Sequence, residues 1–578
     1  MLLLAKLLAI GVAPFTSSAA ALVALLWQDA LVALVVASVA MTLRPRWLVW
    51  TTWIVFVGYV ALNVPIARVL GSPLTLTMMH AASGALGDSI RHDLTAGNVT
   101  RIAIVLAVGI VAPVLARRLA ASRRASLSLL VTSLVVIATG PIAAARVDTN
   151  GFDRNAITAL WPRAHLSRAA AVVDLDWRRS PFDRRVIDAF SAHALRLRQG
   201  YGGQAMPQAL SGAARGRNVI LVVLESTAAQ YLKIYGAQDD PMPTLTSLAQ
   251  RSLVVDAAYA AYPESVKGLY ATLCGRFPIF DVPAERHAAL PCTSIAQSLA
   301  ARGYRTALFH SGRFGYLGMA ELIHDKGFDL LEDAGTIGGH VESSFGVDET
   351  TTVDRLLGWI DEAGETSPFF AAYLPIAGHH PYASSAPGPF DGVREIDAYK
   401  NALYDADRAL ARLLDGLRAR GRDRSTMLVI VGDHGEAFGQ HPHNAGHTLF
   451  IYDENVRVPF VVSMPWLLQE QRRMPIVASL VDVGATIRDL VGDDEVAADA
   501  DGRSILEPGN RMALFFTDYS RGWLGLRDGC WKYLFETDAS RSTLFDVCDD
   551  PGETRDRAAG EIPRVNAYRD RLLAWGAR

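Results

Sequence analysis

Two strongly apolar segments of this chain each lead directly into side chains of the types that bind metal ions. Residues 218–224 form an unbroken apolar run rich in β-branched residues, typical of a buried strand, and lead into Glu225. A second run, 427–431, leads into Asp433 and His434. One acid at a strand end is an ordinary turn residue, but this combination suits a Zn²⁺ or Mn²⁺ site, with Mg²⁺ and Ca²⁺ as alternatives.

The sequence around these ligands predicts an α/β domain. From residue 218 onward, short apolar runs alternate with helical patterns, for example at 294–302 and 399–418. This alternation predicts a largely parallel sheet with helices on both faces. Because sites in such sheets gather at the carboxyl ends of the strands, the ligands are expected to meet there. Further strands are expected at 304–309, 369–374 and 458–462.

The first 146 residues have a different composition. They contain no Glu, and their only acids are Asp29, Asp88 and Asp93. A helix needs roughly 20 apolar residues to cross a bilayer, and about five runs approach that length. They cover residues 4–26, 28–43, 48–70, 101–119 and 126–146. A bundle of about five transmembrane helices over 1–146 is therefore expected, because a cleaved signal peptide would explain only the first run.

Arginines beside these spans predict the orientation in the membrane. One group lies between the second and third spans, and the other lies between the fourth and fifth. The two groups are Arg44 and Arg46, and Arg117, Arg118, Arg123 and Arg124. Since positive charge marks cytoplasmic loops, everything after residue 146 is expected outside. This describes a multi-pass protein of the inner membrane with a periplasmic catalytic domain.

The segment after the bundle is expected to connect two domains. Residues 147–217 predict a juxtamembrane connector, in which 165–199 mixes Arg with apolar residues as an interfacial helix does. The glycine-rich run 199–204 predicts a flexible break. The catalytic domain is then expected over 218–578, with a small C-terminal subdomain from about 510.

The overall charge bears on nucleic acid binding, and the four cysteines leave open whether they form disulfides. The chain has 56 basic and 59 acidic residues, so its charge does not indicate nucleic acid binding. Four cysteines form two pairs of equal spacing, Cys274 with Cys292 and Cys530 with Cys548. In an oxidising compartment each pair is a candidate local disulfide, and the alternative is four buried thiols.

Five motifs occur in order between residues 218 and 555. They are Asn-Val-Ile-Leu-Val-Val-Leu-Glu at 218–225, Ala-Gly-His-His-Pro-Tyr at 377–382, Val-Gly-Asp-His-Gly-Glu at 431–436, Gly-His-Thr-Leu-Phe-Ile-Tyr-Asp-Glu-Asn-Val-Arg-Val-Pro at 446–459 and Leu-Phe-Asp-Val-Cys-Asp-Asp-Pro-Gly-Glu-Thr at 544–554. In order and spacing this region resembles the sulfatase-like branch of the alkaline phosphatase superfamily. That branch includes arylsulfatases, lipoteichoic acid synthases and lipid A phosphoethanolamine transferases.

The resemblance implies a nucleophile and two assisting histidines. The nucleophile of the family lies on a segment ending in Gly-Arg, here 265–276, which makes Ser265 the expected nucleophile and a further metal ligand. A free serine hydroxyl is a poor nucleophile, so metal coordination must activate it. By the same resemblance, His379 and His447 bind the non-bridging oxygens of the ester or assist the leaving group.

Several alternatives accompany these assignments. Ser265 could be a plain helix cap, and its nearest rivals as nucleophile are Ser226 and Thr227, which sit beside the presumed ligand. Lys267 is interpreted as a lysine on a helix surface. Three further residues are candidates for substrate contact, namely His310, Arg313 and His380.

Two departures from the sulfatase pattern favour a phosphate ester over a sulfate ester. Formylglycine sulfatases need a Cys-x-Pro-x-Arg-like sequence where this chain reads Ser265-Val-Lys-Gly-Leu. Sulfatases also typically bring paired Asp residues to the end of the first strand, where this chain has the single Glu225. We therefore expect a metal-dependent phosphotransferase or phosphodiesterase that acts through a Ser-linked intermediate.

The five-span anchor predicts a membrane lipid or lipid-linked glycan as substrate, with a substituent of the phosphoglycerol or phosphoethanolamine type. A sulfuric ester hydrolase remains the alternative enzyme, and a catalytically inactive membrane sensor or scaffold is the alternative of another class. A transporter is disfavoured because the spans are interpreted as lacking intramembrane charge pairs.

Overall fold

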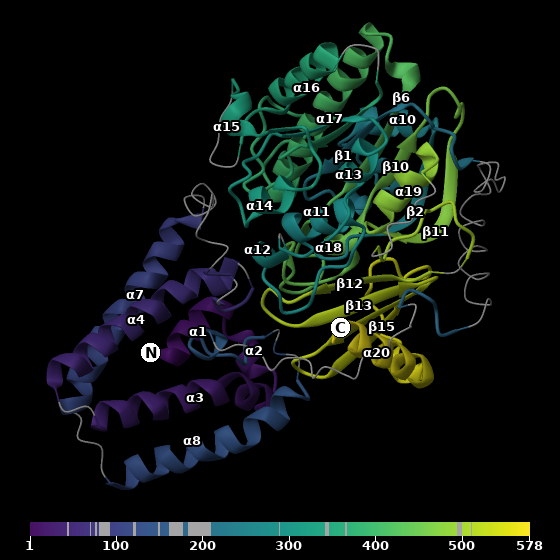
Figure 1. The fold of residues 1–578 in the computed structure, drawn as a ribbon. Coiled ribbons are helices and arrows are strands. Elements are labelled where there is room, and N and C mark those ends of the chain that lie inside the picture. Colours follow the sequence, from purple (N-terminus) through teal and green to yellow (C-terminus); the bar gives the residue numbers. More distant parts are fainter. Residues whose placement is uncertain are drawn as a thin grey trace.

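The computed structural model of the protein has a helical N-terminal part and an α/β part that carries a second, smaller sheet (Figure 1). It describes residues 1–42, 45–69, 71–75, 78–79, 93–118, 123–147, 149, 151–160, 177–182, 210–287, 289–340, 346–363, 367–493, 500–509 and 511–577.

Four helices of the described N-terminal part are long and apolar enough to cross a membrane. They are α3 (Ala19–Thr42), α4 (Arg46–Val69), α7 (Ala96–Arg118) and α8 (Arg123–Ala144). The first predicted span is instead divided between α1 (Leu2–Ile10), α2 (Ala13–Thr16) and the start of α3. The chain turns at Gly11, whose φ of 78° suits glycine, so the bundle has four candidate spans rather than about five.

The packing of these helices brings one pair of opposite charges together. α3 packs along α8, α4 packs along α7, and α1 lies against α4 (Figure 1). Nζ of Lys6 on α1 lies 2.5 Å from Oδ2 of Asp29 on α3, and both side chains are buried. The interpretation that this region lacks charge pairs is therefore wrong. The break at Gly11 folds α1 back, so that two residues far apart in sequence neutralise each other.

The central sheet has nine strands and is largely parallel, as predicted. Its order is β11-β2-β10-β6-β1-β5-β3-β4, with β9 paired to β2. The strands are β1 (Asn218–Leu224), β2 (Ser252–Tyr259), β3 (Arg305–His310), β4 (Leu330–Glu332), β5 (Phe369–Leu374), β6 (Thr426–Gly432), β9 (Arg457–Val458), β10 (Phe460–Ser463) and β11 (Arg472–Ser479). β1 runs parallel to both β5 and β6, whereas β10 is antiparallel to its neighbours β6 and β2.

Helices cover both faces of this sheet, which confirms the predicted α/β sandwich (Figure 1). One face packs against α11 (Ser265–Cys274), α13 (Ile295–Ala300), α14 (Met319–His324) and α19 (Asp482–Val491). The other packs against α10 (Pro243–Ala249), α16 (Glu349–Ala363) and α17 (Glu395–Ala419). Alternate side chains of β1 enter the two cores, for example Leu221 on one face and Val222 on the other. This double burial explains why β1 reads as one unbroken apolar run.

A four-stranded antiparallel sheet follows in the region predicted as a C-terminal subdomain. It comprises β12 (Ala513–Thr517), β13 (Trp523–Asp528), β14 (Trp531–Glu536) and β15 (Arg541–Asp546), and α20 (Ile562–Gly576) packs against it. The shorter helices and strands are α12 (Ala284–His287), α15 (Ala334–Ile337), α18 (Asp453–Val456), β7 (Ala437–Phe438) and β8 (Ala445–Gly446). The 3-10 turns are η1 (Thr158–Leu160), η3 (Ala229–Tyr231), η4 (Lys233–Tyr235), η5 (Asp423–Ser425) and η6 (Ala558–Gly560).

A buried lysine joins this smaller sheet to the larger one. Nζ of Lys532 on β14 lies 2.7 Å from Oδ1 of Asp453 on α18 and 2.8 Å from Oε1 of Glu553. The Glu553 carboxylate also accepts a hydrogen bond of 2.6 Å from the backbone of Asp453. The last two sequence motifs, around residues 453 and 553, thus meet at one buried ion cluster.

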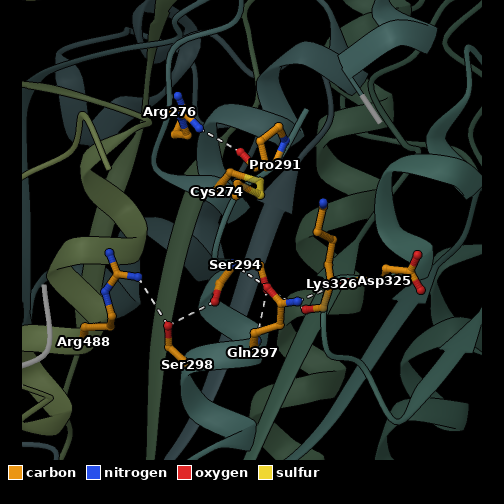
Figure 2. The surroundings of a disulfide bond; sticks show 10 residues. Cys274, Arg276, Pro291, Ser294, Gln297, Ser298, Asp325, Lys326 and Arg488 are labelled. Atoms are coloured by element: carbon orange, nitrogen blue, oxygen red, sulfur yellow. Dashed lines mark hydrogen bonds between the residues drawn. A yellow bond between two sulfur atoms is a disulfide. The ribbon is translucent and has the colours of Figure 1, made fainter. Parts of the chain in front are cut away.

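Both cysteine pairs form disulfides, which resolves the alternative of four buried thiols. Cys274 is bonded to Cys292 and Cys530 to Cys548. Figure 2 shows the first bond, which ties the end of α11 to the segment that leads into α13. That segment is held further by the Ser294 hydroxyl, which donates to the carbonyl of Lys326. α11 is therefore fixed at its C-terminal end.

The predicted interfacial helix at 165–199 lies almost entirely outside the described residues. The described piece, 177–182, lies against the α/β part through Arg178, whose Nη2 donates to Oδ2 of Asp482 at 2.7 Å. Met512 and Arg178 also exchange backbone and side-chain hydrogen bonds.

Candidate active site

Two neighbouring parallel strands deliver the predicted metal ligands to one point. Leu224 of β1 pairs with Gly432 of β6, so Glu225 and Asp433 leave the sheet side by side. Nε2 of His434 lies 3.6 Å from Oε1 of Glu225 and 3.4 Å from Oδ2 of Asp433. The ligand atoms of these three buried residues all lie within 4.8 Å of one another.

Hydrogen bonds orient the ligand atoms toward the centre of this cluster. Nδ1 of His434 lies 2.9 Å from the carbonyl of Gly435 and must donate to it, because a carbonyl only accepts. Nε2 of His434 therefore presents a lone pair to the two carboxylates. Oδ1 of Asp433 accepts from the backbone N–H groups of Ser226 at 2.9 Å and His434 at 2.7 Å, and its Oδ2 faces the cluster.

The electrostatics of the cluster favour a bound cation. Burial raises the pKa of Asp433 to about 7, and burial together with the charge of Asp433 raises the pKa of Glu225. Burial lowers the pKa of His434 to about 4. Two buried carboxylates and an imidazole lone pair that face one another are costly unless a positive charge lies between them. The donor set fits a divalent metal ion.

Ser265 reaches this cluster from the start of α11. The helix is capped by Glu264, whose carboxylate accepts from the backbone N–H groups of Val266 at 2.8 Å and Lys267 at 3.1 Å. Ser265 is thus not the cap, and its hydroxyl is available for another role. Its Oγ donates to Oε2 of Glu225 at 3.0 Å and lies 3.4 Å from Nε2 of His434.

A glycine favours the close approach of α11 to the ligand loop. A Cβ on Gly268 would lie 3.1 Å from the carbonyl oxygen of Asp433, closer than ordinary van der Waals contact. The small residue lets the first turn of α11 pack against the loop that carries the ligands.

The two rival hydroxyls are placed less favourably. Ser226 and Thr227 are fully buried, whereas Ser265 is only partly buried. The Thr227 hydroxyl donates to the carbonyl of Glu225 at 3.0 Å, and the Ser226 hydroxyl donates to Oε1 of Glu225 at 3.0 Å. Accessibility to a substrate distinguishes Ser265 from both.

A second titratable pair lies beside the ligand cluster. Nδ1 of His447 lies 2.8 Å from Oε2 of Glu436, and the Tyr382 hydroxyl donates to Oε1 of Glu436 at 2.8 Å. The rings of His447 and His434 stack with centroids 4.2 Å apart. Burial raises the pKa of Glu436 to about 7 and lowers that of His447 to about 4. Glu436 was not singled out from the sequence, although it ends the motif at 431–436.

His379 and His380 are neighbours in sequence but face different surroundings. Nδ1 of His379 lies 2.7 Å from the carbonyl of His380, and its imidazole is close enough to Glu225 to oppose in part the rise that burial causes in the pKa of Glu225. Its ring packs edge-on against Tyr316. Nε2 of His380 instead lies 3.8 Å from Oε1 of Glu395 on α17. The structure brings His379 toward the cluster and His380 toward α17.

His310 and Arg313 lie at and after the end of β3. His310 is buried, its Nδ1 donates to the carbonyl of Leu374 at 2.9 Å, and its ring stacks on Phe314. Burial lowers the pKa of His310 to about 4. Arg313 is partly exposed on the loop that follows. β3 pairs with β5, the neighbour of β1, so both residues belong to the same edge of the sheet.

Comparisons with known proteins agree with the fold of this part of the chain. Residues 217–493 match the family model for Sulfatase. This segment is therefore a Sulfatase domain. In fold, the sulfatase-like domain is similar to the lipoteichoic acid synthase LtaP from Listeria monocytogenes, at 18% identity and a TM-score of 0.53, over 68% of this chain and 97% of that one. It is equally similar to Ps i-CgsB in complex with k-i-k-neocarrahexaose, at 19% identity and a TM-score of 0.53, over 63% of this chain and 93% of that one.

Among curated proteins, the chain is similar both to a lipoteichoic acid synthase-like protein and to an arylsulfatase. It is 23% identical to the lipoteichoic acid synthase-like YvgJ of Bacillus subtilis (strain 168), over 49% of each chain. It is 24% identical to arylsulfatase K of Bos taurus, over 37% of this chain and 44% of that one. The chain thus spans about half or less of the length of these relatives.

Lys267 of the sulfatase-like domain is not on a helix surface, so that interpretation is wrong. Its side chain is buried, and its Nζ lies 3.1 Å from Oδ1 of Asp518 and 3.9 Å from the ring centroid of Tyr262. The segment after β12 covers this face of α11 with a carboxylate. Because Lys267 lies two residues after Ser265 on α11, the ion pair holds Asp518 against the first turn of this helix.

Proposed function

We propose that the protein is a membrane-anchored, metal-dependent enzyme that transfers or hydrolyses a phospho-substituent of an envelope lipid or lipid-linked glycan. The substituent is of the phosphoglycerol or phosphoethanolamine type. Residues 1–146 anchor the chain in the membrane, and residues 147–217 connect this anchor to the catalytic domain. Residues 218–578 form that domain. The observation that carries the proposal is the accessible Ser265 hydroxyl within hydrogen-bond distance of Glu225 and close to His434.

The reaction begins with Ser265. Its hydroxyl passes its proton to Oε2 of Glu225 as its oxygen attacks the phosphorus of the ester. Glu225, Asp433 and His434 would hold a divalent cation, which would activate the hydroxyl and balance the charge of the phosphoryl group. As the bond from phosphorus to the leaving oxygen breaks, His447 or His379 in its protonated form donates the proton that this oxygen needs. For His447, the negative charge of the bound phosphodiester must offset the burial that lowers its pKa.

The second half of the reaction releases Ser265. The hydroxyl of the acceptor, which is water or a lipid or glycan alcohol, attacks the phosphoserine. The bond between phosphorus and Oγ breaks, and Ser265 takes back the proton that Glu225 accepted in the first step. His447 is suited to accept the proton of the acceptor, because its Nδ1 is held by Glu436 and its other nitrogen is available.

Contacts of the N-terminal part support a substrate that resides in the membrane. Thr75 donates to the carbonyl of Tyr519 at 3.1 Å, and Nη1 of Arg154 donates to the carbonyl of Ser520 at 2.7 Å. These two carbonyls directly follow Asp518, the partner of Lys267 near Ser265. The helical part thus holds a segment that flanks the nucleophile, as expected if substrate arrives from the bilayer.

The orientation proposed from the sequence is compatible with four spans. The arginine-rich loops still join α3 to α4 and α7 to α8, so both lie on one side of the membrane. With an even number of spans, we expect the sulfatase-like domain and the residues before α3 on the opposite, periplasmic side. Two disulfides in that domain support the same side.

A sulfuric ester hydrolase is the second candidate, because arylsulfatase K is among the similar proteins. The single Glu225 and the absence of a Cys-x-Pro-x-Arg-like sequence at Ser265 favour phosphate. An inactive scaffold is disfavoured by the complete set of ligands, since a protein without activity is free to lose any of them.

Three serine variants of the full-length protein test the nucleophile. Ser265→Ala should abolish release of head group from cell-envelope lipids. Ser226→Ala should retain measurable activity, and Ser247→Ala, on the exposed surface of α10, should match the wild type. Thermal unfolding of all three checks that the fold is intact. Full activity of Ser265→Ala would overturn the proposal, and loss with Ser226→Ala alone would move the nucleophile to Ser226.

A further inference from the structure

A cavity of about 400 Å³ lies where the helical part meets the sulfatase-like domain. The end of α1, the end of α4 and Phe152 line one side of it, and the loop between β7 and β8 lines the other. The volume falls within the range of small-molecule sites. None of the residues assigned to the catalytic cluster lines it.

The length of α4 places this cavity at the surface of the membrane. Arg46 and Arg68 lie 22 positions apart on α4, or about 33 Å along the helix axis. The hydrocarbon core is about 30 Å thick, so the two arginines match its two boundaries. Arg68 lines the cavity, which therefore lies at the depth of lipid head groups on the side of the sulfatase-like domain.

The lining has both apolar and polar groups, which suits an amphipathic ligand such as a lipid. Ala9, Ile10 and Val69 offer apolar surface from the membrane helices, and Arg68 and His443 offer polar groups. Both polar side chains are exposed. Within the described part of the chain Arg68 has no ion-pair partner, so its charge is available to a ligand. A guanidinium at this depth suits a phosphate group.

One wall of the cavity is the hairpin β7–β8, which is also flanked by residues of the catalytic site. The hairpin β7–β8 begins directly after Glu436 and ends directly before His447. Gly439 and Asn444 line the cavity, each three residues from one of these catalytic residues, a span of at most about 10 Å.

Close contacts fix this hairpin against the helical part. The ring of His443 packs edge-on against Phe152, with centroids 5.8 Å apart. A Cβ on Gly71, whose φ is 62°, would lie 2.9 Å from the carbonyl oxygen of His443. Only a glycine fits there, so the chain after α4 and the tip of the hairpin touch directly. A ligand in the cavity would therefore contact the hairpin directly.

We propose that this cavity binds the phosphate head group of an anionic membrane phospholipid, with Arg68 as its cationic contact and the acyl chains beside α1 and α4. Its role is to hold the lipid next to the hairpin that positions Glu436 and His447. Binding of the lipid stands on the cavity alone, while its use as substrate or acceptor rests on the proposed function.

Native mass spectrometry of the full-length protein tests the site. The protein is released from nanodiscs of phosphatidylcholine with and without phosphatidylglycerol, and the retained phosphatidylglycerol is counted. Arg68→Gln should retain about fivefold less than the wild type, the effect of one cation at a membrane surface. Arg46→Gln removes the same charge from the opposite end of α4 and should retain as much as the wild type. Arg68→Lys keeps the charge and should recover most of the retention.

The outcomes separate this proposal from the catalytic one. Equal retention by Arg68→Gln and the wild type, or equal losses with Arg68→Gln and Arg46→Gln, would overturn the site. Displacement of phosphatidylglycerol by soluble glycerol phosphate would overturn the assignment to a lipid. Ser265→Ala should retain phosphatidylglycerol normally. Activity of Ser265→Ala would refute the proposed chemistry while leaving the result for Arg68 intact.

Discussion

The hydroxyl of Ser265 donates a 3.0 Å hydrogen bond to Glu225, forty positions earlier in the chain. Glu225 ends β1, Ser265 begins α11, and the adjacent strand β6 brings Asp433 and His434 to the same point. Because Ser265 and Glu225 are far apart in sequence, local structure alone cannot keep them in contact. The parallel sheet fixes the ligands, and the capped, disulfide-anchored helix α11 brings the nucleophile to them.

Loss of metal should destabilise the protein, because the cluster is built of buried carboxylates. The purified wild type is expected to contain bound divalent metal by elemental analysis, and His434→Ala to lose it. Removing the metal with a chelator should cost about 3 kcal/mol of stability, the linkage expected for a ligand well above its Kd. Glu321→Gln, an exposed acid on α14, serves as control. Wild-type protein without metal, or unchanged metal content in His434→Ala, would contradict the assigned ligands.

His447 is expected to serve the leaving group rather than the metal. His447→Ala should slow cleavage of a diester with an alkyl leaving group by about 10²–10⁴, the usual contribution of a general acid. A nitrophenyl diester, whose leaving group needs no proton, should lose far less. His324→Ala, on an exposed side chain, should affect neither. Equal losses with both substrates would show that His447 acts before the leaving group departs.

The buried lysine between the two sheets should be essential for stability. Lys532→Met leaves Asp453 and Glu553 buried without their cation, a change that costs about 3–5 kcal/mol. Lys233→Met, on a largely exposed lysine, should cost less than about 1 kcal/mol. Thermal unfolding in detergent measures both. Adding Asp453→Asn and Glu553→Gln to Lys532→Met should restore much of the loss, and no restoration would refute the charge argument.

Glu349 should make the fold more stable at low pH. Its carboxylate accepts from Ser311, Tyr373 and the backbone of Ile376 and Ala377, and burial raises its pKa from 4.5 to about 7. Between these values the folded state keeps the proton that the unfolded state releases. Its contribution to stability is therefore complete below pH 4.5 and is lost as the pH rises through 7.

Glu349→Gln cannot titrate, and its amide oxygen can still accept from Ser311, Ile376 and Ala377 while its amide N–H donates to the Tyr373 hydroxyl. From pH 5 to 8 the wild type should lose up to about 3 kcal/mol relative to this variant. Thermal unfolding of both proteins across that range gives the difference directly. A difference that stays constant with pH would show that Glu349 is ionised throughout.

Local patterns in the sequence predict much of the fold. β1 and β5 have the predicted bounds, because both faces of each strand are buried and the apolar runs are uninterrupted. The division of the first apolar run into α1, α2 and α3 was not predicted. Composition remains apolar across the turn at Gly11, so hydropathy alone does not show where the chain reverses.

Within the site, the residues at strand ends could be predicted and the contacts between distant segments could not. Glu225, Asp433 and His434 follow recognisable strands, and parallel strands that pair must bring them together. The burial of Lys267 depends on Asp518, which lies 251 positions away. The pairing of Glu436 with His447 likewise depends on the hairpin β7–β8, whose two-residue strands are too short to be recognised from alternation.

Mass spectrometry of the peptide that contains Ser265, after incubation of the full-length protein with cell-envelope lipids, tests the central claim most directly. A phosphoglycerol or phosphoethanolamine adduct on Ser265, absent from Ser265→Ala, is the predicted result. Formylglycine at this position, or an unmodified Ser265 during turnover, would contradict it.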